Sequence, residues 1–112
     1  MIILGIGGLH DDPACAILRD GHLLAAVEEE KLRYSSNGAW PRRAVDTALK
    51  TAGVTDVDCV ALVRPFTPAV VQAARERFPN ARLVMVEHHA AHAASAFFLS
   101  GFGNATVLTL DR

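Results

Sequence analysis

The chain has 112 residues, of which 51% are hydrophobic and 21% are charged, and its formal net charge is −1. This composition is ample for the core of one compact domain or of part of a larger one, and it excludes disorder as the main state. Acidic and basic residues are mixed along the chain, so no basic face indicates nucleic-acid binding and no acidic block indicates a charged tail.

The cysteines and the apolar segments favour a soluble, cytoplasmic protein. Cys15 and Cys59 lie far apart within apolar runs, which is typical of buried, reduced thiols. The first residues contain neither a charged leader nor a cleavage site, and no apolar run approaches the length of a membrane span. We therefore expect a cytoplasmic chain whose partners bind at a defined site.

The first part of the chain predicts three consecutive strands. Residues 1–6 form a nearly continuous apolar run, and residues 14–18 and 22–28 form two further strand-like runs. Asp20 and Gly21 lie between the last two runs, and this dipeptide is a strong signal for a two-residue hairpin turn. The fold is therefore expected to open with an antiparallel meander.

A Gly-rich turn that contains Gly7, Gly8, His10 and Asp11 follows the first strand. It is not a dinucleotide-binding GxGxxG motif, because His10 occupies the last glycine position, and no Gly-Lys-Ser/Thr follows to make a Walker A loop. Taken alone, the segment predicts a tight turn with a hydrogen-bonded histidine. Its backbone N–H groups would nevertheless lie where phosphate oxygens can approach.

The remainder of the chain alternates helices with strands. The charged run after the third strand holds Glu30 and Arg33, which either are solvated or face a ligand. Prolines fit the first turns of two helices, and Gly53 fits the end of one of them. The expected segments are a helix at 41–52, a strand at 57–63, a helix at 65–78, a strand at 82–86, a helix at 88–100 and a strand at 105–110.

Two histidines at the start of the last helix form a candidate metal site. His88 and His92 are four residues apart and therefore lie on one face of a helix, where two imidazoles can bind one Zn(II) or Fe(II) ion. Asp111 ends the apolar run at 105–110 and could complete a set of two histidines and one carboxylate. The alternative is a solvated histidine pair at a helix start.

His89 distinguishes this site from a zinc peptidase. Those enzymes need a glutamate directly after the first histidine as the general base, and this chain has His89 there. His89 points elsewhere on the helix than the two candidate ligands, so we expect it to support them from outside the ligand set or to be exposed.

The predicted order βββαβαβαβ favours an α/β fold, with helices covering a sheet that contains parallel strands. A three-strand meander followed by αβαβ is the order of one lobe of the actin-like, ribonuclease H-like fold. Residues 1–87 would form a first lobe, residues 88–103 a linking helix and turn, and residues 104–112 the first strand of a truncated second lobe.

On its motifs, the chain resembles the N-terminal part of the NodU/CmcH-type O-carbamoyltransferases, which are related to the tRNA threonylcarbamoyl transferases. The resemblance covers essentially the whole chain, and its histidine motif is specific. The matching segments are Ile3 to Ile6 with His10-Asp11, Ala14 to Ala16, Arg19 to Gly21, Ala25 to Arg33, Trp40-Pro41, His88 to Phe97 and Thr109 to Asp111.

The resemblance implies a metal, usually taken as iron, bound by His88, His92 and Asp111, and it implies that His10 takes part in the transfer step. The implied reaction forms carbamoyl adenylate from carbamoyl phosphate and ATP and moves the carbamoyl group to a hydroxyl of a small molecule such as a sugar or antibiotic. The implied partners are these substrates, the rest of the second lobe and an adenylate-forming domain.

The nucleotide or carbamoyl adenylate would be bound by Gly7, Gly8, Asp11, Glu30 and Arg33. The second hypothesis is an inactive fragment or a partner-dependent subunit that acts as a metal- or nucleotide-binding module. In that case the apolar strand at its end would pair with another copy or with another polypeptide.

Overall fold

The structure, a computed structural model, describes residues 1–29 and 39–110. In these ranges the chain has α/β architecture, and the meander followed by alternating helices and strands agrees with the sequence prediction. The strands are β1 (Ile2–Gly7), β2 (Ala14–Arg19), β3 (His22–Glu28), β4 (Cys59–Val63) and β5 (Arg82–Val86), and the helices are α1 (Arg42–Ala52), α2 (Pro68–Arg77) and α3 (His88–Phe97).

The strands form one mixed sheet in the order β3-β2-β1-β4-β5. β2 is antiparallel to both β1 and β3, whereas β4 is parallel to both β1 and β5. Asp20 and Gly21 have φ angles of 50° and 82°, as a two-residue hairpin turn between right-twisted strands requires. Because β1, β4 and β5 run in the same direction, the loops that follow them emerge at one edge of the sheet.

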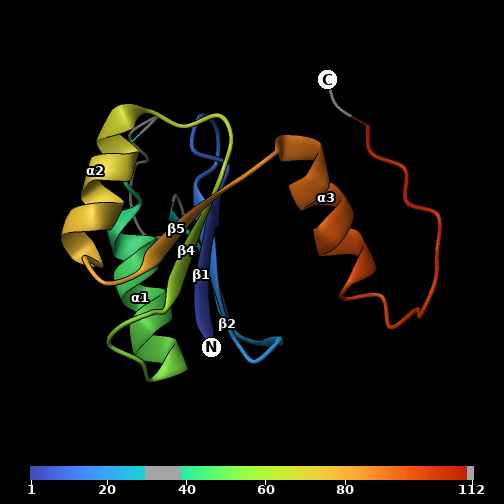
Figure 1. Cartoon of the computed structure of the whole chain (residues 1–112), viewed down its shortest axis with the longest axis horizontal. Coiled ribbons are helices and arrows are strands. Elements are labelled where there is room, and N and C mark those ends of the chain that lie inside the picture. The colour runs from blue at the N-terminus through green and yellow to red at the C-terminus, as the bar shows by residue number, and fades with distance from the viewer. Residues whose placement is uncertain (30–38, 111–112) are drawn as a thin grey trace.

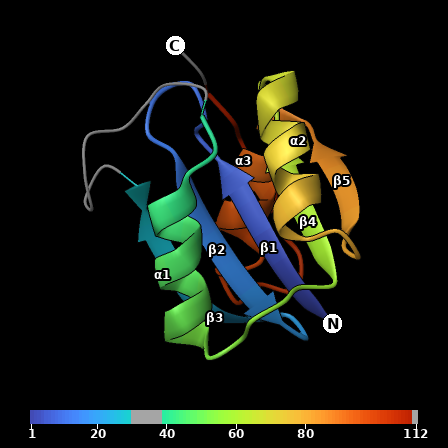
Figure 2. The same cartoon turned by 90° about the vertical axis from the view of Figure 1, so that its left-hand side faces the viewer.

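The core lies between the sheet and two of the helices. α1 and α2 cover one face of the sheet, whereas α3 stands on the opposite side and contains no buried residue (Figures 1 and 2). Burial of a large apolar side chain stabilises a fold by about 1.5–3 kcal/mol. The apolar core between the sheet and helices α1 and α2 therefore supplies most of the stability of the fold. Its largest fully buried side chains include Leu4, Ile6, Ile17, Val45, Val60, Leu62, Val70 and Phe78.

A buried carboxylate holds the start of α1. Pro41 occupies the N-cap position and makes no side-chain capping bond. The carboxylate of Glu29, which is 5% exposed, instead accepts a hydrogen bond of 2.7 Å from the Ala44 N–H. This bond satisfies one of the N–H groups that a helix start leaves without a helical partner. Gly53 ends α1, as predicted, and the structure shows it in the left-handed conformation with φ 72°.

Both cysteines are free and buried, as the sequence predicted. Burial raises the pKa of the Cys15 thiol to about 12, and the nearby Glu29 carboxylate contributes to the increase. The thiol of Cys15 therefore remains protonated near neutral pH and has a structural role in the core.

The predicted strand at 105–110 is wrong within the described part of the chain: those residues run beside α3 and form no strand (Figure 1). A strand requires a neighbouring backbone with which to pair, and α3 offers none. α3 itself ends at Phe97 rather than near residue 100, and α2 begins at Pro68 rather than at residue 65. Across residues 1–29 and 39–110, no helix is long and apolar enough to span a membrane.

Candidate functional site

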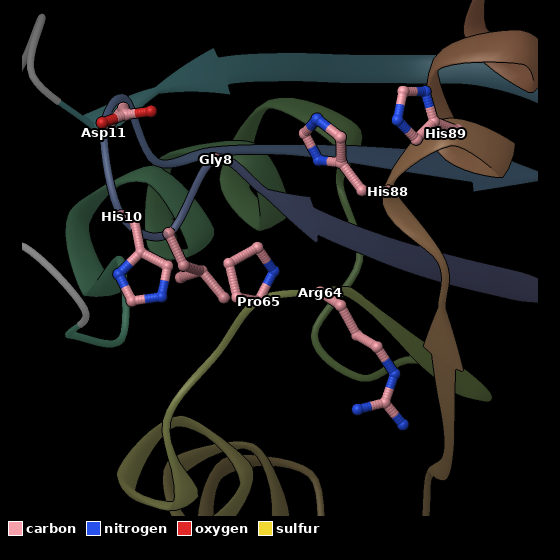
Figure 3. A pocket seen from close by; sticks show the side chains of 8 residues that line it. Gly8, His10, Asp11, Arg64, Pro65, His88 and His89 are labelled. Carbon is pink, nitrogen blue, oxygen red and sulfur yellow. The ribbon is translucent and has the colours of Figure 1, made fainter. Parts of the chain in front are cut away.

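An open cavity of about 420 Å³ lies at the sheet edge where β1, β4 and β5 end. Its walls come from the loop after β1, the loop after β4 and the start of α3 (Figure 3). Ligands of open α/β sheets commonly bind at the carboxyl ends of parallel strands. The residues that line the cavity are Gly8, Leu9, His10, Asp11, Arg64, Pro65, His88 and His89.

The loop after β1 requires glycine at position 8. Gly8 has a φ of +67°, and a Cβ atom there would lie 2.3 Å from the carbonyl oxygen of Asp12. No real Cβ atom tolerates that contact with backbone, so only glycine allows the loop to close beside the cavity. Gly7 differs: a Cβ atom there would lie 3.5 Å from Val63, an ordinary contact, and Gly7 does not line the cavity.

His10 and Asp11 occupy the turn that follows Gly8. The N–H of Asp11 donates a hydrogen bond of 3.1 Å to the carbonyl oxygen of Gly8, which fixes the turn. Both side chains are exposed, and they leave the turn in different directions (Figure 3). The imidazole of His10 is therefore accessible to a ligand in the cavity.

α3 begins at the cavity because Glu87 caps it. The Glu87 carboxylate accepts a hydrogen bond of 2.9 Å from the N–H of Ala90, and its pKa is lowered by this bond and, to a greater degree, by a bond from the N–H of His89. A carboxylate at this position also interacts favourably with the helix dipole. The cap fixes where α3 begins and so places His88 in the first turn of the helix, beside the cavity.

The side chains of His88 and His92 converge. Their Nε2 atoms are 3.1 Å apart, and the two rings are nearly perpendicular, with an interplanar angle of 86°. A separation of 3.1 Å is a hydrogen-bond distance, so the structure brings the two predicted ligands together on one face of α3, and metal binding by the pair stays a prediction.

His89 lines the cavity beside His88, and its exposed ring also contacts the end of the described chain. Its Nδ1 atom is 3.0 Å from the hydroxyl oxygen of Thr109. This hydrogen bond holds residue 109 beside the start of α3. The sequence predicted that His89 would be exposed or would support the ligands from outside, and its exposure agrees with that prediction.

Three of the residues predicted for the site, Glu30, Arg33 and Asp111, lie outside the described residues. Among the residues that the structure describes, no three His, Cys, Asp or Glu side chains are grouped as a metal site. The described part of the predicted ligand set is therefore the pair of His88 and His92.

Sequence reasoning missed Arg64 and Pro65 as members of the site. Both directly follow β4, and β4 lies beside β1 in the sheet, so their loop emerges next to the loop that carries His10. The available signal was their position immediately after a buried strand that was predicted to run parallel to the first strand.

No protein-family profile matches the chain. The chain is 33% identical to nodulation protein NolNO of Sinorhizobium fredii in an alignment that is 132 positions long and covers 89% of this chain and 19% of NolNO. It is 28% identical to the uncharacterized protein sll1178 of a Synechocystis species in an alignment that is 153 positions long and covers 97% of this chain and 25% of that protein. The chain thus spans about a fifth to a quarter of the length of these curated relatives. The similarity to NolNO supports the carbamoyltransferase resemblance at a coarse level.

Proposed function

We propose that the chain is the N-terminal portion of an O-carbamoyltransferase of the NodU/CmcH type, folded as one lobe of an actin-like structure. The observation that carries the proposal is the cavity, which collects His10, Asp11 and His88 although they belong to two motifs far apart in the sequence. The same two motifs carry the resemblance to the family. The reaction proposed is transfer of a carbamoyl group from carbamoyl adenylate to a hydroxyl of a small molecule such as a sugar or antibiotic.

His88 and His92 are proposed to bind a divalent metal, with Fe(II) favoured over Zn(II) and with Asp111 as the third protein ligand. The separation of 3.1 Å between the Nε2 atoms supports this assignment. The contact between His89 and Thr109 also supports it, because it brings the described chain to α3 two residues before Asp111. When bound, the metal would supply a Lewis acid that polarises the carbamoyl donor.

His10 is proposed to act as the general base that takes the proton of the acceptor hydroxyl. Histidine is suited to this role near neutral pH, and the exposed ring lies at the cavity. The loop of Gly7, Gly8 and Asp11 would hold the nucleotide part of the donor, with Gly8 allowing close approach of the backbone. Glu30 and Arg33 are proposed to bind the same ligand.

The function is tested with the longest polypeptide that the gene encodes around this chain, incubated with carbamoyl phosphate, ATP and a panel of sugar and aminoglycoside acceptors. Mass spectrometry should detect an acceptor that has gained one carbamoyl group. Because general-base catalysis contributes about 10²–10⁴-fold to rates, His10→Asn should reduce transfer by about 100-fold while carbamoyl adenylate still forms. Failure of every acceptor to be carbamoylated although carbamoyl adenylate accumulates would contradict the proposal.

A second candidate function is a partner-dependent binding module without activity of its own. It is favoured by the large apolar side chains that the residues after α3 leave in solvent: Phe98, Leu99, Phe102, Leu108 and Leu110 are each at least 68% exposed. A surface of this kind marks an interaction site more often than a free surface. In this case the chain would bind metal or nucleotide and would acquire activity only with a partner.

A further inference from the structure

The backbone of Arg64 is held beside the strand that leads to α3, and Arg64 lines the cavity together with the loop after β1 and the start of α3. Its backbone N–H donates a hydrogen bond of 2.9 Å to the carbonyl oxygen of Val86, which lies two residues before His88. Arg64 thereby extends the pairing of β4 with β5 by one residue, and Pro65 then turns the chain toward the loop that carries His10 (Figure 3). The position of its backbone relative to α3 is set by the sheet.

The side chains that line the cavity favour a negatively charged ligand. Arg64 is a permanent cation with several N–H donors, and His10, His88 and His89 add three imidazoles that can donate hydrogen bonds. Asp11 is the only acidic residue among the lining residues that the structure describes. Such an excess of hydrogen-bond donors beside one permanent cation suits an oxyanion.

The guanidinium group of Arg64 keeps its donors available. Its carbon atom lies 5.4 Å from the centroid of the Phe66 ring, over the ring face. A cation–π contact engages the flat face of a guanidinium and leaves the N–H groups at its edge free. Within residues 1–29 and 39–110, no acidic side chain forms an ion pair with Arg64.

Arg64 is also free to change its side-chain conformation. The side chain is exposed, and its head points away from the rings of His10 and His88 (Figure 3). Because the backbone is held and only the contact with Phe66 must be given up, rotation about side-chain bonds can redirect the head at small cost. A ligand that enters the cavity can therefore recruit it.

We infer that Arg64 is the residue that anchors a phosphate-type oxyanion in this cavity. The inference rests on the proposed function in one respect: the oxyanion would be the phosphoryl group of the carbamoyl donor. Arg64 provides a planar pair of N–H donors that matches two phosphate oxygens, which a lysine cannot match in the same way. It thereby binds and orients the ligand in the cavity that it lines together with His10, His88 and His89.

The test is a titration of the full 112-residue chain with inorganic phosphate, followed through the backbone amide signals of Gly8 and His88 by NMR. Arg64→Gln should weaken phosphate binding by about tenfold, the loss expected for a charge-assisted hydrogen-bonded contact. Arg64→Lys should retain an intermediate affinity. Arg77→Gln is the matched control, because Arg77 also lies over an aromatic ring, that of Phe78 at 4.7 Å, but belongs to the end of α2.

An unchanged phosphate affinity in Arg64→Gln, an equal loss in Arg77→Gln, or no effect of phosphate on the unmodified chain would each overturn the inference. The metal content of the same chain after dialysis against Fe(II) or Zn(II) separates the inference from the proposed function. Phosphate binding that depends on Arg64 in a chain that binds no metal would support the anion site and contradict the metal-dependent transferase. Metal binding without Arg64-dependent phosphate binding would overturn the anion site and support the metal-dependent transferase.

Discussion

Glu29 shows how one buried side chain can connect the sheet to a helix. Its carboxylate leaves the end of β3 and bonds to the N–H of Ala44 in the first turn of α1. Glu29→Ala should lower the free energy of unfolding by about 1–3 kcal/mol, because a buried N–H loses its acceptor. Urea denaturation measures this change.

Glu28→Ala provides the control for that experiment, since Glu28 precedes Glu29 but its side chain is exposed. It should change the free energy of unfolding by no more than about 0.5 kcal/mol. Equal destabilisation by the two substitutions would contradict the capping role of Glu29.

At the level of single residues, sequence reasoning succeeds where the relation is local. The spacing of His88 and His92 fixes their common helix face, and the Asp20-Gly21 dipeptide fixes its own turn. The roles of Glu29 and Arg64 depend on contacts with segments distant in the sequence. No periodicity in the sequence reports such contacts, so these roles required the structure.

At the level of elements, the loop between β1 and β2 gives the sharpest prediction. Gly8→Ala should destabilise the chain both through the positive φ and through overlap with the carbonyl oxygen of Asp12. The φ angle alone costs about 1–2 kcal/mol, and the overlap forces the loop to shift in addition. Thermal denaturation and the amide spectrum of the loop would detect both effects.

Gly21→Ala separates the two causes. Gly21 also has a positive φ, +82°, but a Cβ atom there would meet nothing within 4 Å. It should therefore show only the cost of the φ angle and be clearly less destabilising than Gly8→Ala. If Gly21→Ala were as harmful as Gly8→Ala, close packing at position 8 would not be the reason for glycine there.

The order of elements was predictable because each carries its own pattern: apolar runs for β1 and β4, and proline and glycine at the ends of α1. The predicted strand at 105–110 failed for a different reason. Its sequence is apolar and strand-like, but a strand forms only beside another strand, and residues 105–110 pair with neither edge strand of the sheet, β3 or β5. Composition reports the tendency to form a strand and not the presence of its neighbour.

At the level of the whole molecule, the apolar side chains after α3 predict association. Size-exclusion chromatography with light scattering should show that the chain forms dimers or larger species, or that it binds another polypeptide supplied with it. Leu108→Lys with Leu110→Lys should reduce that association, since both side chains are about 80% exposed and add nothing to the core. A strictly monomeric, protease-resistant chain would contradict the prediction.

The central claim is that His88 and His92 bind one metal ion at the edge of the cavity. The most direct measurement is the metal content of the purified chain after anaerobic dialysis against Fe(II) or Zn(II), determined by elemental analysis. The unmodified chain and the control His22→Ala, which changes an exposed histidine on β3, should each retain about one ion per chain. His88→Ala with His92→Ala should retain almost none. Equal metal content in the double variant and the unmodified chain would contradict the account.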